Sequence, residues 1–143
     1  MTGKPMSVAA LRVVRSPLVR EPPVRIALPS PRYVGVARLV AAGVATRLEL
    51  PYDEVDDLQL ALEMALDAAF AAGPEATVTI DTEPALLVTV GPVQPDVLDR
   101  RLHEADALER LSLRSVLARL VDEVAMRTDP FPSIVLRVDL QQA

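Results

Sequence analysis

The hydrophobic and polar positions change period several times along the chain, and each period predicts one type of element. Residues 24–28 and 77–82 alternate apolar with other side chains, and residues 86–90 form a more continuous apolar run. These are the patterns of strands. The short link around Glu83-Pro84 predicts that the second and third strands form an antiparallel hairpin. Residues 133–140 alternate again, which predicts a closing strand after a stiff turn at 129–132.

Three other stretches repeat their apolar positions with the helical period. The first runs from Pro31 to about Leu48, with Ser30 as its N-cap. The second covers residues 56–70 and ends at Gly73-Pro74. The third begins after Ser112 and continues to about Arg127, with its apolar face reaching Val124. These stretches predict three amphipathic helices.

Gly35 and Gly43 interrupt the first of these helices. Glycine weakens a helix interior, so we expect both residues to serve close packing against a neighbour.

The resulting order is β-α-α-β-β-(variable segment)-α-β, which predicts an α+β fold with one mixed or antiparallel sheet and helices on one face. At 143 residues, the chain is the length of one domain. We assign residues 22–143 to that domain, with the variable segment at 91–111. Residues 1–21 carry four basic side chains and one acidic one, and Pro22-Pro23 follows them. We expect residues 1–21 to form a flexible or partner-docking arm.

Composition excludes several classes of function. The net charge of −5 argues against nonspecific nucleic-acid binding. The absence of cysteine excludes disulfides, thiolate metal sites and cysteine nucleophiles. No apolar run approaches the roughly 18 residues that span a bilayer, and no signal peptide is recognisable at the N-terminus. We therefore expect no membrane association and a cytoplasmic location.

Residues 51–62, Pro-Tyr-Asp-Glu-Val-Asp-Asp-Leu-Gln-Leu-Ala-Leu, resemble the start of the central helix of the anti-sigma-factor serine kinases. These are small bacterial regulators of the GHKL, or histidine-kinase-like, ATPase superfamily. Residues 31–38 resemble the family's first helix and residues 113–124 resemble its last, so the resemblance runs from about Val24 to Leu140. It implies the two-layer α/β sandwich of the GHKL (Bergerat-type) kind. It also implies Mg-ATP binding, phosphorylation of a serine on a small antagonist protein, capture of a sigma factor, and a homodimer.

The positions that carry catalysis in that family are apolar here. The family's central helix contains Glu-x-x-x-Asn, in which the Glu acts as a base and the Asn holds Mg²⁺. The resemblance places these roles at Met64 and Ala68, and neither side chain can perform them. A shift of one residue offers Glu63 and Asp67 at the same spacing, but it rotates the pair by about 100° around the helix. We interpret Glu63 and Asp67 as a solvated edge of the helix.

The family's glycine-rich turns are also missing. After the third strand, where the family has Asp-x-Gly-x-Gly, the chain reads Val-Gly-Pro-Val and keeps only Gly91. The turn that opens the family's last helix, where backbone N–H groups cradle phosphate, reads Leu-Ser-Leu-Arg at 111–114. No glycine follows Gly91. Three separate nucleotide-binding elements therefore fail together.

Our leading hypothesis is a degenerate, pseudokinase-like member of this family that uses no cofactor and has no catalytic residues. It would bind a sigma factor, an anti-sigma antagonist or an active kinase paralogue, and we place partner binding on Arg32, Tyr33 and Arg38. One alternative is an active protein serine kinase that uses Mg-ATP with Glu63 and Asp67 as shifted catalytic residues. The other alternative is a plain α+β interaction domain unrelated to sigma factors.

Overall fold

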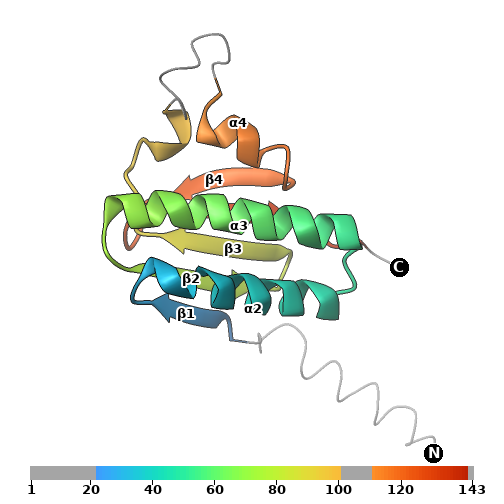
Figure 1. Cartoon of the computed structure of the whole chain (residues 1–143). Helices are drawn as coiled ribbons and strands as arrows, with labels where there is room; N and C mark the ends of the chain where they lie inside the picture. The colour runs from blue at the N-terminus through green and yellow to red at the C-terminus, as the bar shows by residue number, and fades with distance from the viewer. Residues whose placement is uncertain (1–21, 101–110, 142–143) are drawn as a thin grey trace, which may run out of the picture.

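The computed structural model describes residues 22–100 and 111–141, which form a five-stranded antiparallel sheet with two long helices on one face (Figure 1). The strand order in the sheet is β1-β2-β3-β5-β4. This arrangement confirms the predicted α+β class and the predicted antiparallel hairpin. The strands are β1 (Val24–Leu28), β2 (Ala76–Asp81), β3 (Leu86–Gly91), β4 (Glu123–Arg127) and β5 (Ser133–Val138).

The two long helices are α2 (Val34–Arg47) and α3 (Tyr52–Ala72). A single 3-10 turn, η1 (Pro31–Tyr33), leads into α2, and the side chain of Ser30 accepts a hydrogen bond from the Arg32 N–H at 3.3 Å. The predicted N-cap is therefore confirmed. Between α2 and α3, Glu49 has a φ of 62°, the left-handed conformation in which glycine commonly ends a helix.

The core lies between α3 and the sheet and is almost entirely aliphatic. Ile80, Val88 and Leu136 lie opposite one another on three neighbouring strands and are buried. The buried face of α3 packs over them. It consists of Val55, Leu58, Ala61, Leu62, Ala65, Leu66 and Ala69.

The inner face of α2 is a row of three buried alanines spaced four residues apart: Ala37, Ala41 and Ala45. Small side chains in this row let the backbone of α2 approach its neighbours closely. Gly35 and Gly43 do not contribute to this packing, because a Cβ atom on either would meet nothing within 4 Å. The prediction that these glycines serve close packing is therefore wrong for neighbours within the described residues.

The predicted helix from Ser112 to about Arg127 is wrong beyond its first turn and a half. The helix α4 covers only Leu113–Leu117, and residues 123–127 form the edge strand β4 instead. Val124 fits the helical stripe, but Val124 and Met126 also alternate with exposed residues, which is the pattern of a strand. The turn at 129–132 brings them opposite Leu136 and Ile134 of β5. Pairing with a strand already in the sheet outweighs the local helical period, and the element order gains one strand.

The assignment of residues 1–21 to an arm falls outside the described residues, as does most of the variable segment, residues 101–110. The described part of that segment contains one 3-10 turn, η2 (Val97–Asp99). In the part of the chain that the structure describes, no helix combines the length and apolar character needed to cross a bilayer. The cytoplasmic location stays a prediction.

Candidate functional site

Met64 and Ala68 lie on the flank of α3 that faces away from α2. Gln59 and Glu63 face α2, because they contact the backbone and side chain of Arg38. A helix turns by about 100° per residue, so Met64 and Ala68 lie well around the circumference from that contact. Figure 1 shows α4 on the opposite side of α3 from α2. The positions that correspond to the family's catalytic pair therefore face the side of α3 on which α4 lies.

Both residues on this flank are half-buried and pack against the hydrophobic core. The elements on the same side contribute further aliphatic side chains to that core: Leu98 of η2 and Leu117 of α4 have no exposed surface, and Leu113 is 4% exposed. Burying a phosphate group or a cation among these aliphatic side chains of the described residues would be strongly unfavourable.

Glu63 and Asp67 are separated from that flank. The Glu63 carboxylate forms an ion pair with Arg38 at 3.3 Å, and both side chains are 43% exposed. The side-chain amide of Gln59 donates a hydrogen bond to the Arg38 carbonyl oxygen at 3.3 Å. Asp67 is exposed. The structure thus joins Glu63 to α2 and leaves Asp67 in solvent, without bringing either residue beside a second polar cluster.

Gly91 has a packing role that requires no ligand. A Cβ atom at this position would collide with the Ser133 side chain and lie 2.9 Å from the Pro132 carbonyl oxygen. Side chains alternate along β3, and the buried Val90 faces the helices, so position 91 faces the opposite side of the sheet from α3. Gly91, which the resemblance aligns with a glycine-rich turn, thus serves close packing of β3 against the start of β5.

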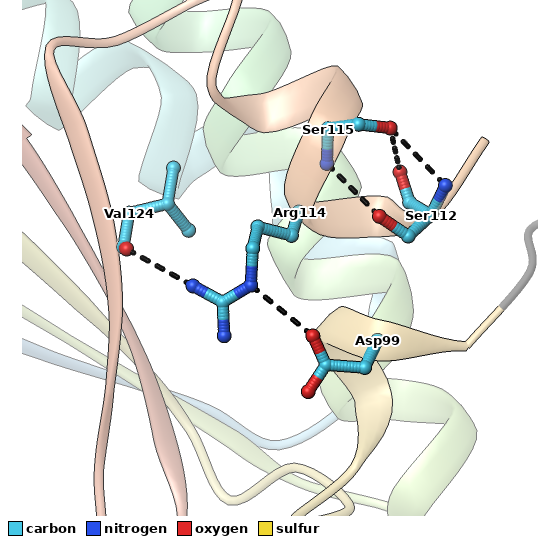
Figure 2. Close-up of polar contacts among 5 residues, drawn as sticks. All are labelled: Asp99, Ser112, Arg114, Ser115 and Val124. Carbon is cyan, nitrogen blue, oxygen red and sulfur yellow. Dashed lines mark hydrogen bonds and ion pairs between the residues drawn. The ribbon is translucent and has the colours of Figure 1, made fainter.

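The N-terminus of α4 is closed by its own side chains, as Figure 2 shows. The Ser115 N–H donates to the Ser112 hydroxyl at 3.1 Å, and the Ser112 N–H donates to the Ser115 hydroxyl at the same distance. This reciprocal arrangement is a capping box. It uses an N–H group of the first turn that an anion would otherwise bind, and it confirms Ser112 as the N-cap.

Arg114 connects α4 to its surroundings. Its Nε donates to the Asp99 carboxylate of η2 at 3.2 Å, and a terminal nitrogen donates to the Val124 carbonyl oxygen of β4 at 3.4 Å (Figure 2). Close by, the exposed Asp96 and Arg100 pair at 2.8 Å. Their hydrogen bond lowers the pKa of the Asp96 carboxyl and raises the pKa of Arg100. The two contacts of Arg114 join η2, α4 and β4 at one edge of the fold.

Three surface hollows among the described residues are lined by residues other than Met64 and Ala68. One, of about 420 Å³, lies near the start of α3 and the end of β5, where it is lined by Glu54, Asp57 and Asp139 among others. Another, of about 380 Å³, lies on the outer face of the sheet and includes Gly91. A third, of about 470 Å³, lies beside β1 and the end of α2. Among the described residues, no group of three His, Cys, Asp or Glu side chains is placed to hold a metal ion.

The three residues expected to bind a partner lie at the start of the α2 region. Arg32 is exposed in η1, Tyr33 is 43% exposed, and Arg38 is engaged with Glu63. The structure also reveals apolar residues that the sequence reasoning missed, because Leu39 is 73% exposed and Val36 is 49% exposed. The sequence does contain a signal for this surface. Apolar side chains lie around most of the circumference of α2, so some of them must remain exposed when one face is buried.

The chain matches no protein-family model. No curated protein matches it in sequence.

Proposed function

We propose that this protein is a non-catalytic regulatory domain, a degenerate relative of the anti-sigma-factor serine kinases, that acts by binding another protein. The observation that carries the proposal is the state of Met64 and Ala68. The resemblance assigns the base and the Mg²⁺ ligand to these positions, and here both side chains are apolar, half-buried and packed against the core. Reversion of one residue would therefore not restore a nucleotide site.

Two further features support the loss of nucleotide chemistry. Gly91 is explained by its close approach to Ser133 and Pro132. The start of α4 is capped by Ser112 and Ser115 in place of a glycine-rich turn. Each change occurs in a different element, so the loss extends across the whole site that the resemblance predicts.

The scaffold supports the family relationship in a general way. A five-stranded sheet with helices on one face agrees with the two-layer GHKL arrangement that the resemblance implies. A scaffold kept without its chemistry is suited to binding. We propose a sigma factor, an anti-sigma antagonist or a kinase paralogue as the partner, and a homodimer as the working form.

Titration calorimetry of the full chain with Mg-ATP tests the catalytic half of this proposal. We expect no binding heat up to millimolar nucleotide, because the described side chains that pack beside Met64 are aliphatic. An active kinase of the resembled family serves as the positive control. Binding at micromolar Mg-ATP, or phosphoryl transfer that disappears in Glu63→Ala, would instead establish the active-kinase alternative.

The binding half is tested with purified sigma factors and antagonist domains from the same organism. We expect one of them to bind the full chain at micromolar concentration or below, as measured by surface plasmon resonance. Failure of every candidate, together with the absence of ATP binding, would favour a plain interaction domain without a role in sigma-factor control.

A further inference from the structure

The solvent side of α2 has an apolar surface that no described element covers. We call it the α2 outer face and define it by Tyr33, Gly35, Val36, Leu39 and Gly43. Tyr33 is 43% exposed, Val36 is 49% exposed and Leu39 is 73% exposed. Single exposed apolar residues are ordinary on protein surfaces, but adjoining ones indicate an interaction site.

These residues form two rows that cross at Leu39. Gly35, Leu39 and Gly43 are spaced by four residues, and Tyr33, Val36 and Leu39 are spaced by three. Side chains at these spacings are neighbours on a helix and form the ridges that pack into the grooves of another helix. Both glycines have open space where a Cβ atom would lie. The Leu39 side chain therefore projects between two depressions, one above Gly35 and one above Gly43. A second helix with two large side chains eight residues apart would fit this shape.

The two glycines are unfavourable for α2 itself. Each weakens a helix interior by about 1 kcal/mol relative to alanine, and neither makes room for any described part of this chain. Close approach of a helix that lies outside the described residues would account for both glycines.

The charges around the α2 outer face select the partner. Between Pro22 and Leu48 the chain contains four arginines and no acidic residue. Arg32 and Arg47 flank the face at its two ends, and both are exposed. They are separated by 15 residues, or about 22 Å along a helix. Arg38, on the side toward α3, is already compensated by Glu63. Neither Arg32 nor Arg47 forms an ion pair with another described residue, so the two side chains at the ends of the face are positively charged.

This charge argues against two possible occupants. A second copy of α2 would set arginine against arginine in either helix direction. Residues 1–21 carry four basic side chains against one acidic one, so their charge also opposes the face. An acidic partner matches it at both ends.

We infer that the α2 outer face binds an acidic, amphipathic helix of about four turns from a partner protein. The inference rests on the proposed function, since it specifies the chemistry of the partner. The partner helix lays its apolar seam over Leu39, inserts large side chains above Gly35 and Gly43, and places carboxylates near Arg32 and Arg47. This is the helix-in-groove mode of recognition. A contact of this size belongs to the weaker, reversible class of interfaces.

Two synthetic 18-residue helical peptides test the inference against the full chain. Both carry the seam Leu-x-x-x-Ala-x-x-x-Leu, with glutamate at the flanking positions of one peptide and lysine at those of the other. We expect the acidic peptide to bind at least tenfold more tightly in fluorescence anisotropy at 0.15 M salt. Equal affinity for the two peptides, or a preference for the basic one, would overturn the inference.

Variants show whether the binding takes place on this face. The double variant Gly35→Leu/Gly43→Leu fills the holes with good helix formers in open space, so the fold should persist, and we expect at least a tenfold loss of affinity for the acidic peptide. Arg32→Glu/Arg47→Glu should reverse the preference between the peptides.

Tyr52→Ser, which changes an exposed aromatic residue at the start of α3, should leave the affinity unchanged. Unchanged binding by the leucine variant would place the peptide elsewhere and overturn the inference.

The peptide experiment and the tests of the proposed function can fail independently. If the chain binds Mg-ATP at micromolar concentration and also prefers the acidic peptide, the non-catalytic proposal is wrong and the inference about the α2 outer face is retained. Tight binding of a sigma factor or antagonist by both the wild type and Gly35→Leu/Gly43→Leu would leave the function standing and overturn the inference.

Discussion

Two apolar surfaces on neighbouring helices have opposite surroundings. On α3, Met64 and Ala68 are half-buried and pack against the core. On α2, Val36 is 49% exposed and Leu39 is 73% exposed, with no described element over them. The first surface is partly covered by its own fold, and the second is open to solvent between Arg32 and Arg47. Apolar residues on the two helices can therefore have different roles, and the packing around them distinguishes a residue of the core from a candidate contact with a partner.

The strongest way to test this contrast is to make the same substitution on both helices. Leu62→Ala on the buried face of α3 should lower the free energy of unfolding by about 2–5 kcal/mol, because a fully buried leucine leaves a cavity. Leu39→Ala on α2 should change it by less than about 0.5 kcal/mol. Urea denaturation measures both values. Similar losses for the two variants would mean that Leu39 is covered in solution.

A smaller effect is expected where a glycine is enclosed. Gly91→Ala should destabilise the fold by about 1–3 kcal/mol, the usual cost of forcing extra atoms into a packed site, because the new Cβ meets Ser133 and the Pro132 carbonyl. Gly73→Ala, whose Cβ would meet nothing within 4 Å, is the matched control for thermal unfolding. A Gly91→Ala variant as stable as its control would contradict the close approach of β3 to β5.

The open glycine on α2 should respond in the other direction. Gly43→Ala is expected to raise the free energy of unfolding by about 0.5–1 kcal/mol, since alanine favours the helix and meets no obstacle. Calorimetry should show a higher melting temperature than that of the wild type. A lower one would place a neighbour over Gly43 in the free protein.

The smallest effect concerns the ion pair that joins the two helices. Arg38→Met removes the ion pair with Glu63, in which both side chains are 43% exposed. We expect a loss below about 0.5 kcal/mol, as for other surface pairs. The difference between variant and wild type should disappear in 1 M salt, where such charges are screened. A larger loss that persists in salt would show that the methylene groups of Arg38 pack between α2 and α3.

Much of the fold could be predicted from the sequence, because its strands and long helices repeat their apolar positions regularly. The N-caps at Ser30 and Ser112 and the turns at 83–85 and 129–132 have local chemical signals that the structure confirms. Residues 123–127 could not be assigned in this way. Val124 fits both a helical and a strand pattern, and only its partner Leu136, far along the chain, decides between them.

The candidate site was less accessible to sequence reasoning. The sequence shows that Met64 and Ala68 are apolar, but not which side chains pack on that side of α3. Leu98 is fully buried although it comes from a segment that is charged nearly throughout. The α2 outer face was hidden for the opposite reason. When most positions of a helix are apolar, the period does not tell which of them face solvent.

The chain has 13 prolines, and several of them lie next to the edge strands of the sheet. Among the described strands, β1 and β4 are the edges, where unpaired backbone groups invite further strands from other molecules. Pro22 and Pro23 precede β1, Pro29 follows it, and Pro130 follows β4. Proline has no N–H group to offer an incoming strand, so these prolines oppose added pairing beyond both ends of β1 and beyond the C-terminal end of β4. Four of the 13 prolines thus disfavour edge-to-edge aggregation of the sheet, an effect for which other proteins use charged residues such as lysine.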